Sequence, residues 1–557
     1  MTLDFIGKSS ESAKNSQTRS TISHGNANAR TLRDEPLDLT DVIEDHEKEL
    51  NRRELYSLEF RNFANSSKDQ KSNVWINRRQ TTKTSDGIKA SAEPDGGNPN
   101  MINNPPSTIG KKEDTNKKKE GMMTEKMFLR RESYLTALSK VTHIKTIYHI
   151  SYVIFFVYLL NNIINDYCMR GSVRFGLDTI KLGFRDIHYA FGVWILQKAF
   201  VCSLYYNIRI WWNIRAIFLE NGSLQRLWSL SCLLAYITSQ VTFIYIPSKI
   251  CQTWNLPFAT TAALLLETCR MLMKMHAYTR TICARLSHRD TKGKLDQSMP
   301  TFGKYLYYLF APTFLYRDSY PRTSHIRWKF AVARFTECVC ITFLFSFIHE
   351  NQLRPYLANS GKEELLASFY MQRFFDILAP CMLILLGTFY LILHAWLNFT
   401  AELLRFGDRM FCRDWWTARN YDSYFRDWNV VVGDWFYELI YKDLYLHVFK
   451  GSKNACLLVV YLLSALMHEF FLIYGLKMFF PVLFVLFCGF GVACIFITRR
   501  LSASWGNLFF WTTLTFGNGI MFFLYYLEYY TSQNCPKESY KSWSDFLIPH
   551  LWSCYAK

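Results

Sequence analysis

Histidines in or beside apolar segments are the residues of this chain best suited to transfer a proton within a membrane. Four are candidates, namely His149, His394, His447 and His468. His468 has the most suggestive setting, because it lies in SALMHEFF within a long apolar run, with Ser464 one helical turn earlier on the same face. A neutral imidazole in a low-dielectric site would accept a proton from an alcohol and act as a general base. Position and spacing alone leave open the alternative of a structural histidine that is hydrogen-bonded inside a helix bundle.

Motifs for other kinds of catalysis are absent from the sequence. It has no G-x-S-x-G elbow, no H-E-x-x-H zinc pair and no P-loop, so we predict neither a covalent triad nor a metal site. Nucleic-acid motifs are also absent, and the formal net charge of +18 comes largely from basic residues that flank apolar runs. Anionic lipid head groups account for such residues, which makes membrane lipid the expected partner and nucleic acid an unexpected one.

The elements that would position His468 are membrane helices. Aromatic residues make up 17% of the 557 residues and charged residues only 20%. A span needs ~20 mostly apolar residues, and by this criterion we predict an all-α polytopic membrane protein with about nine transmembrane helices. The predicted spans are 147–164, 191–212, 227–246, 256–277, 328–348, 375–399, 455–474, 478–497 and 508–526.

Charged residues occur inside three of these spans, the second, fourth and fifth. We expect their side chains to face protein or a cavity rather than lipid, because an isolated charge is unfavourable in the bilayer. The residues concerned are Lys198, Glu267, Arg270, Lys329, Arg334 and Glu337.

Residues 1–125 differ in composition from the rest of the chain. They are rich in Ser, Thr, Asn, Lys and Glu and contain no apolar segment of the kind that opens a secretory signal peptide. We expect a mostly disordered cytosolic tail, because such a segment buries too little apolar surface to offset its ordering entropy. An amphipathic pre-membrane segment is predicted at 126–146, followed by the membrane domain at 147–530 and a C-terminal tail at 531–557.

The orientation follows from the basic cluster before the first span, which places the N-terminal side in the cytosol. An odd number of spans then puts the C-terminal tail in the lumen. The chain has 15 cysteines, and most lie in apolar segments as expected for buried thiols. Cys535 and Cys554 lie in the tail, where an oxidising lumen would let them pair.

The longest membrane-proximal loop, 405–454, is rich in Trp and Tyr among alternating acids and bases. These aromatic residues favour the membrane interface, where an apolar ring and a polar edge are both satisfied. We predict amphipathic helices that lie against the membrane on the cytosolic side.

Six ordered segments of the chain resemble the sterol O-acyltransferases (acyl-CoA:cholesterol acyltransferases) of the membrane-bound O-acyltransferase superfamily. The segment most similar to the family signature is FGDRMFCRDWW at 406–416. The others are RESYLTALSKVTHIKTIYH at 131–149, YLYYLFAPTFLYRDSYPRT at 305–323, FRDWNVVVGDWFY at 425–437, SALMHEFF at 464–471 and GNGIMFFLYYLEYY at 517–530. The resemblance extends over residues ~125 to 557.

The resemblance implies a reaction in which a sterol 3β-hydroxyl attacks the thioester of a long-chain acyl-CoA in the endoplasmic reticulum membrane. No tightly bound cofactor is implied, and acyl-CoA is a co-substrate. By this analogy His468 is the base, and the Asn429 amide holds the thioester carbonyl or its developing oxyanion. The positions that line the acyl-CoA tunnel in the family correspond to Arg426, Gly433, Tyr441, Lys453 and Ser464.

Other family positions have structural roles. The signature residues Phe411, Asp414, Trp415 and Trp416 are expected to brace the loop. His149 falls in a stretch implicated in sterol contact, and simple helix packing is the alternative. The cysteines of the C-terminal tail, Cys535 and Cys554, match a lumenal disulfide, and family members form dimers and tetramers, which implies a homo-oligomer.

Two positions depart from the family pattern. Thr417 replaces the Asn that normally ends the signature, and Gly433 replaces a His in the acyl-CoA tunnel. The loss of this imidazole would weaken acyl-CoA binding or change acyl preference. It also keeps a catalytically silent scaffold among the alternatives. A diacylglycerol acyltransferase of the same superfamily is a further alternative, as is a transporter, although the repeated halves typical of many transporters are not visible.

Overall fold

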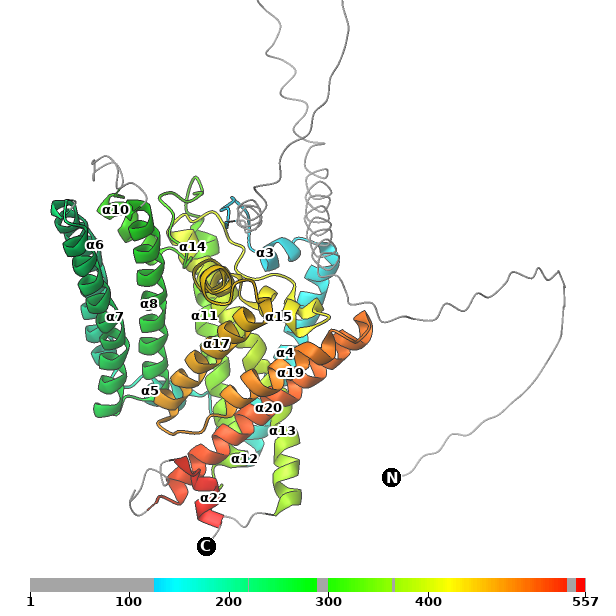
Figure 1. The fold of residues 1–557 in the computed structure, drawn as a ribbon. Helices are drawn as coiled ribbons and strands as arrows, with labels where there is room; N and C mark the ends of the chain where they lie inside the picture. Colours follow the sequence, from blue (N-terminus) through cyan, green and yellow to red (C-terminus); the bar gives the residue numbers. More distant parts are fainter. Residues whose placement is uncertain (1–124, 219, 288–298, 363–365, 538–546, 556–557) are drawn as a thin grey trace, which may run out of the picture. The chain divides into compact units, whose positions relative to one another are not determined.

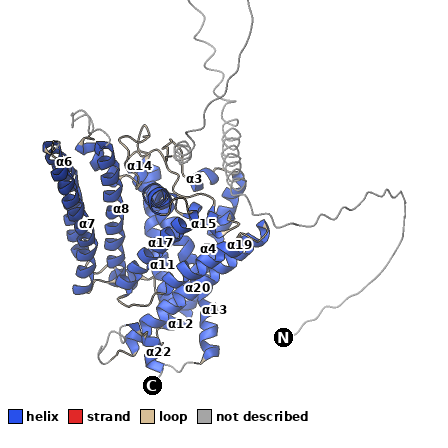
Figure 2. Ribbon diagram, in the orientation of Figure 1, coloured by secondary structure: helices blue, strands red, loops and turns tan. Residues whose placement is uncertain are grey.

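The structure is a computed structural model in which every regular element among the described residues is a helix (Figure 2). It describes residues 125–218, 220–287, 299–362, 366–537 and 547–555, so the predicted tail lies outside them except for its last residue. The helices are α3 (Tyr134–Leu138), α4 (Thr142–Arg170), α5 (Leu177–Gly183), α6 (Ile187–Ile217), α7 (Gly222–Thr253), α8 (Phe258–Ser287), α10 (Phe302–Phe310), α11 (Trp328–Ile348), η1 (His349–Leu353), α12 (Arg354–Leu357), α13 (Ala367–Phe389), η2 (Tyr390–Trp396), α14 (Leu397–Leu403), η3 (Trp415–Thr417), α15 (Tyr421–Trp428), α16 (Val430–Phe436), η4 (Tyr437–Tyr441), η5 (Leu444–Val448), α17 (Lys453–Leu476), α18 (Val482–Phe484), η6 (Val485–Gly491), α19 (Val492–Thr498), α20 (Ala503–Asn534) and α22 (His550–Tyr555).

Seven helical segments of the described chain are long and apolar enough to cross a membrane, which confirms the predicted class of polytopic membrane protein. The seven are 142–170, 187–217, 222–253, 328–357, 367–403, 453–476 and 503–534. The two other predicted spans are also helical, but they differ in character. Helix α8 carries several charged residues, and Val482–Thr498 is a shorter apolar helix.

Several membrane helices contain irregular turns. The first membrane helix, α4, is followed directly by Gly171, whose φ of 72° is the left-handed conformation that glycine adopts at helix C-termini. Wider π-type turns occur in η2, in η4 and in η6, which interrupts the helix at 482–498. Such turns are frequent at functional sites, because they turn side chains away from the regular helical faces.

The membrane helices pack in two connected groups (Figure 1). Helices α6, α7 and α8 contact one another, and α8 also packs against α17. In the second group, α13 packs along α20, and α11 packs against the continuous stretch formed by η2 and α14. The helix that contains His468, α17, packs against α8 of the first group and also contacts η6 and α18, and α18 in turn contacts α20 of the second group.

Most of the predicted internal charges are paired within the protein. Glu267 of α8 contacts Lys198 of α6 and accepts from Arg270 Nε at 2.6 Å. On α11, Arg334 lies 2.5 Å from Glu337. Lys329 differs from the others, because its side chain is exposed in the first turn of α11. A charge at a helix end reaches water by extending its side chain, and does not need a protein partner.

The aromatic loop at 405–454 is folded into helices whose apolar faces contact other parts of the protein. Trp415, Tyr421 and Tyr424 belong to one buried cluster together with Phe389 and Phe510 from membrane helices. The predicted amphipathic helices are therefore present as α15 and α16, and their apolar faces cover protein. Contact of the loop with lipid stays a prediction for its exposed side.

The pre-membrane segment predicted at 126–146 begins with an extended stretch of chain. Residues 125–133, which we call the strap, are extended, and the helices that follow are α3 and the start of α4. Arg131 N donates to Gly407 O at 2.9 Å, and its side chain binds Asp408 at 2.7 Å. Local sequence periodicity does not reveal this conformation, because its hydrogen bonds are made with residues almost 300 positions away.

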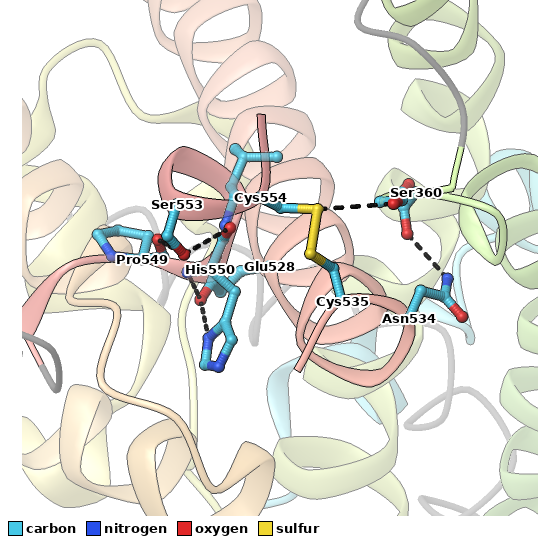
Figure 3. Close-up of a disulfide and its surroundings, with 10 residues drawn as sticks. Ser360, Glu528, Asn534, Cys535, Pro549, His550, Ser553 and Cys554 are labelled. Atoms are coloured by element: carbon cyan, nitrogen blue, oxygen red, sulfur yellow. Dashed lines mark hydrogen bonds and ion pairs between the residues drawn. A yellow bond between two sulfur atoms is a disulfide. The ribbon is translucent and has the colours of Figure 1, made fainter. Parts of the chain in front are cut away.

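The C-terminal segment is attached to the end of α20 (Figure 3). Cys535 and Cys554 form a disulfide with their Cα atoms 6.1 Å apart. Glu528 accepts hydrogen bonds from the backbone N atoms of His550 at 2.7 Å and Leu551 at 3.0 Å, and so caps the N-terminus of α22. Asn534 donates to Ser360 O at 2.8 Å, which joins the same region to the end of α12.

Candidate functional site

The hydrogen bond of His468 defines the protonation of its ring. Nδ1 lies 2.7 Å from the backbone carbonyl of Ser464, one turn earlier in α17. A carbonyl oxygen only accepts, so Nδ1 carries the hydrogen and Nε2 of the neutral ring keeps its lone pair. The side chain is exposed, and no packed side chain covers it completely. Nε2 of His468 is thus available to accept a proton.

The Asn429 side chain likewise uses one of its two polar atoms for a structural hydrogen bond and leaves the other available. Its Oδ1 accepts from Val432 N at 3.1 Å, and Asn429 is the N-cap of α16. The backbone N–H is a donor, which identifies the amide oxygen as the capping atom. Nδ2 has no hydrogen-bond partner within the described residues. Asn429 therefore presents an N–H donor, the group needed to bind a carbonyl oxygen or oxyanion.

Phe487 of η6 connects the helix of His468 with the helix that precedes Asn429. Its ring stacks on the His468 imidazole with centroids 5.6 Å apart and an interplanar angle of 21°. It also contacts Phe425 of α15, with centroids 5.1 Å apart. Phe425 in turn packs against Tyr461 of α17 at 5.1 Å. These contacts relate the α15–α16 region to the His468 side of α17.

The predicted acyl-CoA positions lie on four elements, α15, α16, η4 and α17. Arg426 is exposed near the end of α15, 3.3 Å from Asp427, and Gly433 lies in the middle of α16. Tyr441 ends η4, which contacts α17, and stacks between Tyr437 and Tyr445. The remaining two positions, Lys453 and Ser464, lie on α17 at its first residue and one turn before His468. The structure thus gathers these positions around α15–α17.

The departure at Gly433 leaves space in the protein. A Cβ atom built on this residue would meet only the Arg426 carbonyl oxygen, at 4.0 Å. The position therefore has room for a Cβ atom without movement of the backbone.

The four signature residues each make contacts of a different kind in or beside the loop. Phe411 is buried, and its carbonyl accepts from Val430 N at 3.0 Å, which attaches the signature to the start of α16. The Trp415 ring is also buried, whereas Trp416 contacts Tyr134, the first residue of α3. Asp414 accepts from the Thr417 hydroxyl at 3.1 Å, so the threonine that departs from the family pattern still makes a local contact. None of these contacts involves α17.

The other candidate histidines lie elsewhere. His149 is exposed on α4, and the structure does not bring it to His468, so sterol contact there stays a prediction. His394 is buried in η2 and accepts from Arg334 at 2.7 Å. His447 is exposed in η5.

Some residues of the site are not visible as candidates in the sequence. Glu469 and Tyr525 form a buried hydrogen-bonded pair at 2.8 Å beside His468, and Lys126 of the strap lies 2.6 Å from Asp434 of α16. A charged residue in the apolar run SALMHEFF was the one available signal for Glu469. Across the described ranges, no cluster of three or more His, Cys, Asp or Glu side chains is arranged to hold a metal ion.

Taken together, the intramembrane histidine with a free Nε2, the amide donor and the polytopic helical fold define a membrane-embedded transferase. The model of the membrane-bound O-acyltransferase family matches residues 193–527 of this chain. The sterol O-acyltransferase 1 of Mus musculus is 36% identical over 440 residues, which cover 77% of this chain and 79% of the relative. The sterol O-acyltransferase 2 of Rattus norvegicus is 33% identical, covering 77% of this chain and 81% of the relative. The chain belongs to the membrane-bound O-acyltransferase family and is an acyltransferase.

Proposed function

We propose that this protein transfers a long-chain acyl group from acyl-CoA to the 3β-hydroxyl of a sterol, which forms a sterol ester for storage and releases CoA. The observation that carries the proposal is the geometry of His468, whose Nδ1–H is bound to Ser464 O at 2.7 Å while Nε2 remains available. The similarity to sterol O-acyltransferases 1 and 2 supports a sterol as the acceptor.

In the proposed mechanism, Nε2 of His468 accepts the proton of the sterol hydroxyl as the hydroxyl oxygen attacks the thioester carbon. The Asn429 Nδ2–H group donates to the carbonyl oxygen as negative charge develops there. Collapse of the tetrahedral intermediate breaks the C–S bond, and the imidazolium returns its proton to the CoA thiolate. General-base catalysis of this type contributes about 100- to 10,000-fold in rate. A well-placed oxyanion donor contributes about 100- to 1,000-fold.

Acyl-CoA would approach along the elements α15 to α17. The cations Arg426 and Lys453 are suited to the phosphate groups of CoA. Tyr441 and Ser464 would line the path of the pantetheine and acyl chain toward His468. The space at Gly433 lies on the same path, so its effect is expected on acyl-CoA binding and not on the proton transfer.

We further propose that the protein lies in the endoplasmic reticulum membrane with the tail of residues 1–125 in the cytosol and residues 531–557 in the lumen. The disulfide Cys535–Cys554 is consistent with an oxidising compartment at that end. A homo-oligomer is proposed on the same family resemblance, and the segment before the first span is where we expect its contact.

The test uses membranes that lack endogenous acyltransferases and contain either this protein or a variant. They are supplied with labelled oleoyl-CoA and with cholesterol, a plant sterol or diacylglycerol. We expect sterol ester from the unmodified protein and a loss of at least about 100-fold with His468→Ala. The control is His143→Ala, which changes an exposed histidine in the first turn of α4. Preference for diacylglycerol would overturn the acceptor, and full activity of His468→Ala would overturn the mechanism.

A further inference from the structure

Glu469 is a buried carboxylate immediately after His468 in α17, with an exposed fraction of 4%. One oxygen accepts from Tyr525 Oη at 2.8 Å, and the other accepts from Phe484 N at 2.9 Å and from the same phenol at 2.9 Å. A buried carboxylate is tolerated only when its oxygens are satisfied in this way. Because adjacent helical residues point in different directions, Glu469 and His468 lie on different faces of α17.

Tyr525 completes the arrangement from α20. Its hydroxyl donates to Glu469 and also accepts from Leu483 N at 2.9 Å. Together, Glu469 and Tyr525 bind the backbone N–H groups of residues 483 and 484 at the start of the apolar helix Val482–Thr498. These N–H groups have no intrahelical acceptor, so the two side chains determine where this helix begins against α17.

The first turns of this helix carry Phe487, which contacts the His468 ring. The two rings are stacked 5.6 Å apart, and Phe487 also contacts Phe425 of α15 at 5.1 Å. The Ser464 carbonyl fixes the Nδ1 side of the imidazole, while the stacked phenyl ring restricts rotation of its plane. The direction of Nε2 therefore depends on the position of Phe487.

We propose that Glu469 and Tyr525 are positioning residues for the His468 base, acting through the turn that carries Phe487. The inference rests on the proposed role of His468. Neither side chain touches a reacting atom, so their removal changes the aim of Nε2 and not its chemistry. A displacement of about 1 Å at a reacting atom reduces the rate by as much as about 100-fold.

The first test measures steady-state kinetics of Glu469→Gln and Tyr525→Phe in the membrane assay. Gln offers one acceptor oxygen in place of two, and Phe removes the hydroxyl that bridges to Leu483 N. We expect kcat to fall about 10- to 100-fold in each, with KM for acyl-CoA within about twofold of the unmodified protein. A rise in KM with unchanged kcat would contradict a positioning role.

Glu528→Gln is the matched control. Glu528 has an exposed fraction of 2% and likewise uses both oxygens to bind two backbone N–H groups, those of His550 and Leu551 at the start of α22 (Figure 3). The same substitution therefore removes the same kind of interaction, but at the start of α22 and not at the helix that carries Phe487. We expect its kcat per folded molecule to stay within about twofold. An equal kcat loss in Glu528→Gln and Glu469→Gln would show a general structural effect and overturn the proposal.

A double-mutant cycle with Phe487→Leu tests the route. If Glu469 acts through Phe487, the kcat of the double variant Glu469→Gln/Phe487→Leu is no lower than that of the less active single variant. Phe487→Tyr keeps the aromatic ring and should retain activity. Independent, multiplicative losses would overturn the proposed route. Failure of this proposed route can be distinguished from failure of the proposed function. The proposed function is tested separately, by the acceptor preference of the unmodified protein and by the activity of His468→Ala.

Discussion

At the scale of single residues, His468 and Asn429 share one construction principle. Each uses one side-chain atom for a bond to the backbone, to Ser464 O at 2.7 Å and from Val432 N at 3.1 Å respectively. Each then has a defined second atom for substrate, an acceptor on the imidazole and a donor on the amide. The backbone contact fixes orientation without consuming the group that chemistry needs.

The donor role of Asn429 predicts the effect of Asn429→Asp. Asp caps a helix as well as Asn does, so α16 should form normally. The variant has no N–H donor and places a carboxylate beside the developing oxyanion, so we expect kcat to fall about 100- to 1,000-fold. Asn420→Asp is the control, because Asn420 caps α15 by accepting from Ser423 N at 2.9 Å. Equal activity of Asn429→Asp and Asn420→Asp would exclude the oxyanion role.

The open position at Gly433 predicts that Gly433→His is tolerated. The nearest atom to a Cβ there is the Arg426 carbonyl oxygen at 4.0 Å. A side chain in this space would add contacts to acyl-CoA, and we expect the KM for oleoyl-CoA to fall a few-fold with kcat little changed. The measurement is repeated with acyl-CoA substrates of other chain lengths. Gly506→Ala provides the contrast, because its Cβ would lie 2.2 Å from the Arg419 carbonyl oxygen, and it should reduce the yield of folded protein. An unchanged KM for every chain length would place Gly433 outside the acyl-CoA path.

At the scale of elements, the strap contacts the C-terminal half of α16, whereas Asn429 caps its N-terminus. Lys126 Nζ lies 2.6 Å from Asp434, while Glu438 binds Arg317 at 3.0 Å. Burial raises the pKa of Asp434, and the adjacent Lys126 acts in the opposite direction. The carboxylate thus depends on this lysine to remain charged in a partly buried position.

We therefore expect Lys126→Glu to misplace α16 and with it Asn429, lowering kcat/KM about tenfold in the membrane assay. The exchange Lys126→Asp with Asp434→Lys restores an ion pair and should recover much of the activity. The Lys140 to Glu132 pair is exposed, so Lys140→Glu should have little effect, as is usual for surface pairs. If the exchange recovers nothing, the strap does not act through this pair.

A residue of helix α8, Lys274, is expected to affect the stability of the protein and not its catalysis. Lys274 is fully buried and donates to three backbone carbonyls, those of Tyr308 at 2.6 Å, Ala311 at 2.8 Å and Thr313 at 2.9 Å. It thereby satisfies the C-terminal end of α10. Lys274→Met would leave these acceptors unsatisfied.

Each buried acceptor left without a partner costs about 1–3 kcal/mol. We expect a clear drop in the thermal unfolding temperature of the detergent-solubilised protein with Lys274→Met. The exposed Lys304, in α10 itself, gives the control Lys304→Met, which should unfold at the unchanged temperature. Equal temperatures for both variants would contradict the capping role.

Elements and contacts differ in how far the sequence predicts them. Runs of apolar residues locate the helices, because burial in lipid is a property of each run by itself. The strap and the Glu469–Tyr525 pair depend on residues that are far apart in the chain, and no local period encodes such partners. His468 was found from its unfavourable placement in an apolar run, whereas its tautomer required the Ser464 contact. Asn429 was found only by family resemblance, since an N-cap asparagine has no sequence feature of its own.

At the scale of the whole molecule, the membrane helices and the charge distribution predict one orientation. Basic residues precede the first span, and the C-terminal tail carries a disulfide between Cys535, directly after α20, and Cys554 in α22. Cysteines paired in this way are stable in an oxidising lumen and not in the reducing cytosol. Both observations give the same orientation, although one comes from charge and the other from redox chemistry.

We expect an epitope at the N-terminus to be accessible to antibody in intact microsomes, and one at the C-terminus to become accessible only after detergent is added. The same preparation, alkylated and run without reductant, should show a mobility shift on reduction that is absent from Cys535→Ser and Cys554→Ser. Cys168→Ser, which changes an exposed free cysteine, is the control for the shift. A C-terminal epitope that is accessible without detergent would place the disulfide in the cytosol, and would require an even number of spans in place of the odd number predicted from the sequence.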